Sequence, residues 1–115
     1  MDRDKSERRK SPRANANIVI RYHILEESRD YDLSQSMNVS QDGLLLTTNR
    51  MFHPGTRLAM NAFFPFLNAA IEITGDVVES REVMEDLIYE THIHFHDLEK
   101  KMREQLAGFV EKLAA

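Results

Sequence analysis

The sequence of 115 residues has the length of one domain, and its lack of cysteine excludes disulfide bonds, thiolate metal sites and cysteine nucleophiles. Its formal net charge of -4 is unevenly distributed, because residues 1–13 carry six basic and three acidic side chains while the rest of the chain carries a net charge of -7. Duplex nucleic acid usually requires a broad basic face, which an acidic body does not offer. A small anionic ligand held by the basic segment fits this charge distribution better.

Residues 1–16 contain almost no apolar side chains, which predicts a flexible basic arm ahead of a folded domain over residues 17–115. The longest apolar stretch, residues 62–67, is too short to span a bilayer, so we expect no membrane insertion. The N-terminus shows no apolar signal-peptide segment, which predicts a cytoplasmic location.

Six segments after the arm have the alternation or the composition of β-strands. In the first, alternate positions from Ile18 to Tyr22 are apolar, which predicts one buried face. Asp42-Gly43 is a strong signal for a chain reversal. Gly75 inside an apolar run suggests a bulge or a sharp bend, as barrels need at corners. The predicted strands cover residues 18–23, 31–39, 43–48, 56–64, 69–80 and 87–96.

From Asp97 the apolar residues recur at helical spacing, which predicts a C-terminal helix over residues 97–114. Asp97 is a natural N-cap, and Glu99 would lie in the first turn. Six or seven short strands followed by one amphipathic helix predict a mainly β fold, a small antiparallel barrel plugged or flanked by that helix. The apolar stripe consists of Leu98, Met102, Leu106, Phe109 and Leu113.

The first motif that could bind a ligand is an Arg-x-x-x-Arg formed by Arg9 and Arg13, with Arg8 preceding it. Pro12 pushes Ser11 toward extended geometry, so these arginines do not belong to the interior of a helix. A guanidinium group can donate two hydrogen bonds to a guanine edge, can grip a phosphate, or can stack on a base. The alternative is a solvated basic tail that binds no ligand.

The second motif is an Asn-x-Ser-x-x-Gly at the junction of two predicted strands, formed by Asn38, Ser40 and Gly43. The asparagine amide and the serine hydroxyl can each donate or accept hydrogen bonds, and the glycine permits a positive φ or a close backbone approach. These groups could form a shallow polar cradle. The alternative is a hairpin turn in which a serine or asparagine side chain bonds to the local backbone.

The two motifs in this order resemble the PilZ domain family, bacterial receptors for the second messenger cyclic di-GMP. The family has an Arg-x-x-x-Arg arm followed by an Asp/Asn-x-Ser-x-x-Gly turn, and every required position is matched here. Residues 73–78 and 93–95 also look like landmarks of the family. One departure is visible, because many members have a glycine where this chain has His92.

The resemblance implies a six-stranded antiparallel PilZ-type barrel with a C-terminal helix, and a cyclic di-GMP site on the barrel surface. It implies no cofactor, no enzymatic activity and an arm that folds over the ligand. The output would be altered contact with an unidentified effector protein in control of motility, adhesion or exopolysaccharide production. The implied binding residues are Arg8, Arg9, Arg13, Asn38, Ser40 and Gly43, with Arg81 as a further contact.

Other functions remain open. The first is a PilZ-like protein-interaction module that works without ligand, and the second is a small barrel that binds single-stranded nucleic acid, which the acidic body disfavours. A metal site at His92, His94 and His96 is disfavoured, because side chains on one face of a strand are spaced too widely in line for tetrahedral coordination. A polar outer face of the strand explains these histidines better. An enzyme is the least supported class, because no nucleophile–base pair is recognisable.

Overall fold

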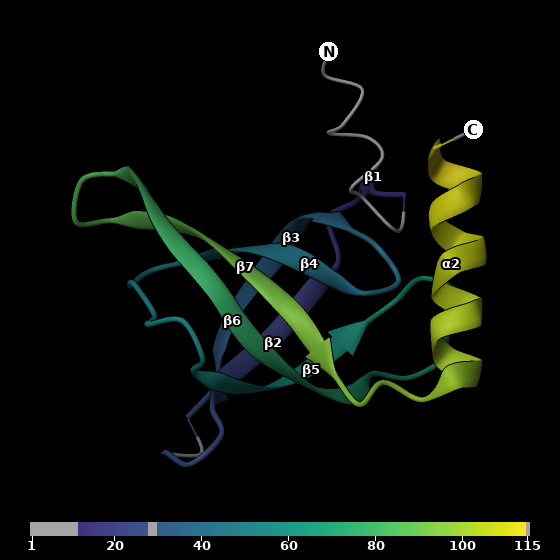
Figure 1. Ribbon diagram of the computed structural model, residues 1–115, viewed down its shortest axis with the longest axis horizontal. Helices are drawn as coiled ribbons and strands as arrows, with labels where there is room; N and C mark the ends of the chain where they lie inside the picture. The colour runs from purple at the N-terminus through teal and green to yellow at the C-terminus, as the bar shows by residue number, and fades with distance from the viewer. Residues whose placement is uncertain (1–11, 28–29, 115) are drawn as a thin grey trace.

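A closed antiparallel barrel of six strands with one helix beside it makes up the part of the chain that the computed structural model describes, residues 12–27 and 30–114 (Figure 1). The barrel has the strand order β3-β2-β5-β6-β7-β4, and β4 closes it by pairing with β3. The predicted six-stranded barrel with a C-terminal helix is therefore confirmed. The elements are β1 (Ala14–Asn15), β2 (Val19–Ile24), β3 (Asp32–Val39), β4 (Gly43–Thr48), β5 (Arg57–Phe63), β6 (Ile71–Met84), β7 (Ile88–His96) and α2 (Lys100–Ala114).

Alternate side chains of the strands fill the barrel interior, as the period of two requires. Ile20 and Tyr22, which the sequence predicts on the buried face of β2, are 0% and 2% exposed. The helix α2 adds Leu106 and Val110 to the same core, and both side chains are fully buried. A single apolar core thus holds the barrel and the helix together.

The strand β3 turns small hydroxyl side chains inward and large apolar ones outward. Ser36 is fully buried, whereas Leu33 is 69% exposed. The hydroxyl of Ser36 donates to the carbonyl oxygen of Ala16 at 2.6 Å and accepts from the N–H of Ile18 at 2.9 Å. Because a buried polar group is stable only when it is hydrogen-bonded, these two bonds explain why a serine can occupy the interior here. They also fasten the segment between β1 and β2 onto β3.

The border between arm and barrel lies earlier than residue 16. Ala14 and Asn15 form β1, which pairs with Val39 and Asn38 at the end of β3, and Ala14 is buried. Residues 14–16, predicted as part of the arm, therefore belong to the folded domain. Residues 1–11 of the predicted arm lie outside the described residues.

The closing strand β4 lies so near β7 that it has no room for a side chain at its first residue. A Cβ added to Gly43 would collide with the carbonyl oxygen of Ile93 and would lie 3.1 Å from the Cα of His94. The φ of Gly43 is not positive, since Gly55 is the one glycine of the described chain in that region. Glycine is required at position 43 because two backbones meet there.

The bulge that the sequence suggested as one alternative at Gly75 is absent. Gly75 keeps its register with both neighbours, pairing with Leu58 of β5 and Phe95 of β7. The register shifts of β6 occur further along, between Val77 and Glu79 and between Glu82 and Met84. A Cβ at Gly75 would collide with a side-chain methyl group of Ile93, so the core has no room for a side chain at this position.

The helix begins at Lys100, three residues after the predicted start, and Asp97 is not its N-cap. Asp97 has a φ of 54°, whereas an N-cap residue is normally in the β region. The first helical hydrogen bond runs from the N–H of Arg103 to the carbonyl oxygen of Glu99 at 2.9 Å, so Glu99 occupies the N-cap position. Across residues 12–27 and 30–114, no helix has both the length and the apolar character that crossing a membrane requires.

Replacing Gly43 with alanine is expected to lower the free energy of unfolding by roughly 1–3 kcal/mol, because the added methyl group meets backbone atoms of β7 that cannot rotate away. Gly108 is the matched control, since a Cβ there meets nothing within 4 Å. In the helix interior Gly108→Ala should raise stability by up to about 1 kcal/mol. Denaturant unfolding of both variants measures the difference. Wild-type stability of Gly43→Ala would contradict the close contact of β4 with β7.

Replacing Ser36 with alanine is expected to lower the free energy of unfolding by roughly 1–3 kcal/mol, because a buried N–H and a carbonyl oxygen lose their hydroxyl partner. The neighbouring Gln35 is exposed, so Gln35→Ala should change stability by less than about 0.5 kcal/mol. Urea unfolding followed by circular dichroism compares the two variants. Equal stability of the two would show that the hydroxyl does not fasten the segment before β2.

Candidate functional site

The turn that carries the second motif is held by its own serine. Residues 40–42 connect β3 to β4, and the N–H of Ser40 donates to the carbonyl oxygen of Gly43 at 2.8 Å. The hydroxyl oxygen of Ser40 accepts from the N–H groups of Asp42 at 3.1 Å and Gly43 at 3.2 Å. Ser40 is 8% exposed, so its hydroxyl shapes the turn from inside. The local turn considered as the alternative for this motif is therefore present.

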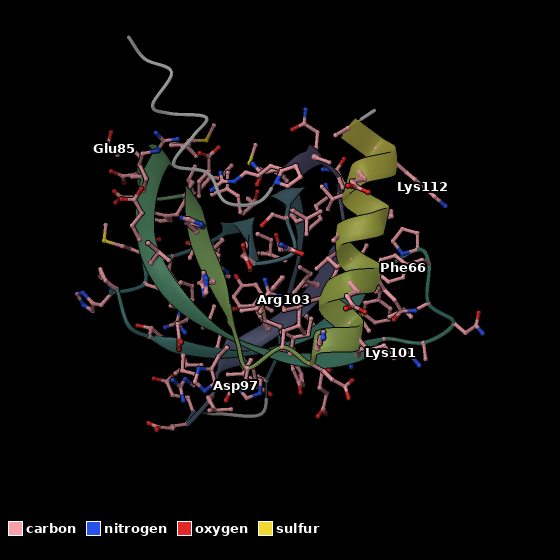
Figure 2. The ribbon with its side chains drawn as sticks, turned by 45° about the vertical axis from the view of Figure 1, so that its right-hand side comes forward. Phe66, Glu85, Asp97, Lys101, Arg103 and Lys112 are labelled. Carbon is pink, nitrogen blue, oxygen red and sulfur yellow. The ribbon has the colours of Figure 1, made fainter. Side chains whose placement is uncertain are left out.

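Two contacts hold the same turn against the rest of the barrel. The carbonyl oxygen of Asp42 accepts from the N–H of Phe95 at 2.8 Å. A carboxylate oxygen of Asp42 accepts from Nη2 of Arg103 at 2.8 Å, and Figure 2 shows Arg103 extending from α2 toward the barrel. A half-exposed ion pair contributes only about 0–1 kcal/mol, yet it fixes the turn relative to the helix. The turn is thus positioned by β7 and α2 together.

The register of the sheet brings one line of side chains together on the outside of the barrel. Asn38 of β3 pairs with Leu45 of β4, Leu45 pairs with His92 of β7, and His92 pairs with Glu79 of β6. We call these four residues the outer row. The strand neighbours Val39, Leu44 and Ile93 are buried, so Asn38, Leu45 and His92 face away from the core. Glu79 follows a register shift of β6 and is itself exposed.

Asn38 is the member of the outer row best able to bind a ligand. Its side-chain amide makes no hydrogen bond with any other residue among those described, and the residue is half-buried. The amide therefore offers a donor and an acceptor on a face that is open to solvent. The backbone of Asn38 is fixed on both sides, by Asn15 of β1 and by Leu45 of β4.

Arg13 enters the same face from the N-terminal side. It directly precedes β1, in which Asn15 pairs with Asn38. Arg13 and Asn15 are exposed while Ala14 is buried, so strand alternation points Arg13 outward, as it does the outer row. Burial and the positive charge of Arg13 both lower the pKa of His92, which places the guanidinium group within electrostatic range of the outer row. Arg8 and Arg9 lie outside the described residues.

Arg81 lies on the same outer face, one step further along the barrel. It pairs across the sheet with Glu90, and its Nη2 donates to a carboxylate oxygen of Glu90 at 2.6 Å. Glu90 precedes His92 by two residues on β7, so Arg81 borders the outer row. A ligand phosphate would have to compete with Glu90 for this guanidinium group.

Sequence reasoning missed two residues of this site. Arg103 contacts Asp42 from 61 positions away, and no local pattern marks such a pair. His92 could be recognised as a residue on the outer face of its strand, but not as a neighbour of Arg13 and Asn38.

Within the described chain, no group of three or more histidine, aspartate or glutamate side chains is arranged to hold a metal ion. The open face, the amide and the guanidinium group suit a flat anionic ligand.

Comparison with known proteins identifies the family. The model of the PilZ domain family matches residues 7–112, and no curated protein matches the chain. The PilZ domain of YcgR from Escherichia coli, solved with c-di-GMP, has a TM-score of 0.67 at 13% identity, covering 93% of this chain and 92% of that chain.

Two longer proteins have the same fold. The Bacillus subtilis inhibitor of motility MotI/DgrA has a TM-score of 0.74 at 14% identity. The match covers 90% of this chain and 50% of that protein. The MrkH–c-di-GMP complex of K. pneumonia has a TM-score of 0.70 at 13% identity. The match covers 92% of this chain and 52% of MrkH. The chain thus spans about half of these two proteins. Because the family model extends from the basic arm to α2, the chain belongs to the PilZ domain family.

Proposed function

We propose that the protein is a receptor for cyclic di-GMP that binds the nucleotide on the outer face of β3, β4 and β7 and catalyses no reaction. The observation that carries the proposal is the meeting of the two motifs: Arg13 and Asn38 are 25 positions apart in sequence, yet they share one outer face beside the turn of residues 40–42. YcgR and MrkH, which share the fold, are described as complexes with c-di-GMP, and this supports the choice of ligand.

In the proposed complex, the arginines would bind the nucleotide through charge and hydrogen bonds, and the turn would provide a surface of fixed shape. Arg8, Arg9 and Arg13 would donate paired hydrogen bonds to guanine edges and to phosphate oxygens. Asn38 would bind a guanine through its unpaired amide. Ser40 and Gly43 would act mainly by holding the turn backbone in place, since the hydroxyl is engaged inside the turn and the glycine is pressed against β7. Arg81 would serve as a further phosphate contact when Glu90 releases it.

Binding would change the surface that the protein offers to a partner. The turn is already fixed by Ser40, Phe95 and Arg103, so the entropy lost on binding falls mainly on the arm. An arm ordered over the nucleotide presents a new surface, which an effector protein in control of motility, adhesion or exopolysaccharide production would recognise. The fold shared with an inhibitor of motility favours the first of these processes. A cytoplasmic location follows from the same proposal, because the nucleotide is an intracellular messenger.

A second candidate is a PilZ-type interaction module that needs no ligand. It is favoured by apolar side chains on the outside of β3, β2 and β5, where Val19 pairs with Phe63 and lies diagonally to Leu33. Val19 and Phe63 are each 43% exposed and Leu33 is 69% exposed. Adjacent exposed apolar side chains of this kind are typical of protein contacts. Absence of cyclic di-GMP binding by the intact chain would favour this candidate.

Replacing Arg13 with alanine is expected to weaken cyclic di-GMP binding by about 5- to 150-fold, which corresponds to the ~1–3 kcal/mol of a bidentate arginine contact. Arg21 of β2 is the matched control, because it is exposed and its guanidinium group lies 4.9 Å from the ring of Tyr31, away from the outer row. Arg21→Ala should bind like the wild-type protein. Isothermal titration calorimetry measures all three affinities. Wild-type affinity of Arg13→Ala would sink the proposed site.

Removing residues 1–13 is expected to abolish binding and leave the barrel folded, because β1 begins at Ala14. Removing residues 1–6 is the matched control, since that segment carries two basic and two acidic side chains and no arginine of the motif. The shorter deletion should retain wild-type affinity. Calorimetry gives the affinities and circular dichroism checks the fold. Binding by the longer deletion would show that the arm is dispensable.

A further inference from the structure

His92 is the third residue of the outer row, and its ring lies on the outer face of the barrel. Leu45 and Glu79 lie beside it on the neighbouring strands. The inward positions on either side belong to Thr91 and Ile93, both fully buried, so the interior has no place for the imidazole ring. The ring is half-buried on the same face as Asn38 and Arg13. Leu45 of β4 separates His92 from Asn38, and Arg13 is within electrostatic range of His92, so a ligand that extends from Asn38 across β4 toward β7 lies over His92.

The charges around His92 come from three directions. Arg13 faces it from the segment before β1, Glu79 from β6, and His94 from the next outward position on β7. Glu90, the preceding outward residue on β7, is neutralised by its pair with Arg81, while β3 and β4 contribute the uncharged Asn38 and Leu45. Burial, Arg13 and His94 lower the pKa of His92, and Glu79 raises it. Burial has the largest effect and the pKa is lowered on balance, which favours the neutral ring in the free protein.

An anion on this face would reverse that balance. A phosphate oxygen that pairs with Arg13 removes much of the repulsion between Arg13 and a protonated imidazole. The same oxygen accepts a charge-assisted hydrogen bond from the imidazolium N–H. The proton comes from solvent, no other bond is made or broken, and the phosphodiester stays ionised throughout. Binding therefore favours the charged form of His92.

We propose that His92 is a binding residue of this site and that it makes nucleotide binding depend on pH, by taking up one proton when a ligand phosphate lies between it and Arg13. The proposal rests on the proposed function, because the ligand is cyclic di-GMP. The pKa of His92 is then higher in the complex than in the free protein. Affinity is accordingly greatest below the pKa of the free protein and falls as pH rises through the pKa of the complex.

The test is calorimetry with cyclic di-GMP at pH 6.0 and pH 8.0 and constant salt, in buffers of different ionisation enthalpy. The wild-type protein should bind roughly three- to tenfold more tightly at pH 6.0 and should take up protons, since one unit of pKa shift corresponds to about tenfold in affinity. His92→Gln should lose both effects, so that its affinity is the same at pH 6.0 and pH 8.0 and no protons are taken up. His53→Gln, an exposed histidine in the loop before β5, is the matched control and should keep both effects.

The outcomes separate the two proposals. No binding by the wild-type protein at either pH overturns the proposed function, and the role of His92 falls with it. Equal affinity at both pH values, or a pH dependence that survives in His92→Gln, overturns the role of His92 and leaves the receptor intact. If His92→Gln does not fold, an NMR titration of the His92 ring in the wild-type protein, with and without cyclic di-GMP, decides. A pKa that does not rise in the complex contradicts the proposal.

Discussion

The closure of the barrel by β4 is the constraint on which the site depends. This strand lies between β3 and β7, and it fits only because Gly43 has no side chain to push against the backbone of β7. The closure brings Asn38 and His92, which lie in distant parts of the sequence, onto one line across Leu45. A wider spacing between β4 and β7 would separate the turn of the second motif from the residues beside it.

Two buried serines fix different parts of the site through their hydrogen bonds. Ser36 holds the chain before β2 from inside the barrel, and this sets where β1 runs and where Arg13 leaves the sheet. Ser40 uses its hydroxyl within the turn. The unpaired amide of Asn38 is then the polar group available to a ligand. The protein thus presents a prepared surface, and in the proposed complex the arginines would approach it from one side.

Much of the fold could be predicted from the sequence, because alternation reports which face of a strand is buried, as in β2 with Ile20 and Tyr22. The inward serines of β3 could not be predicted, since hydrophobicity alone places Leu33 inside and Ser36 outside. The start of α2 was wrong because Asp97, a good N-cap by type, adopts a left-handed conformation. The two motifs named the residues of the candidate site, but their distance from His92 depends on strand order, which no local pattern encodes.

The short strand β1 sets a tether length. Arg9 precedes Arg13 by four residues, so a fully extended chain carries its Cα no more than roughly 14 Å from that of Arg13. A short tether of this kind corresponds to an effective concentration in the millimolar range, far above that of a separate peptide in a cell. In the proposed receptor, rebinding of the nucleotide by the arm would compete with its release, and the lifetime of the complex would depend on the length of the arm as well as on its contacts.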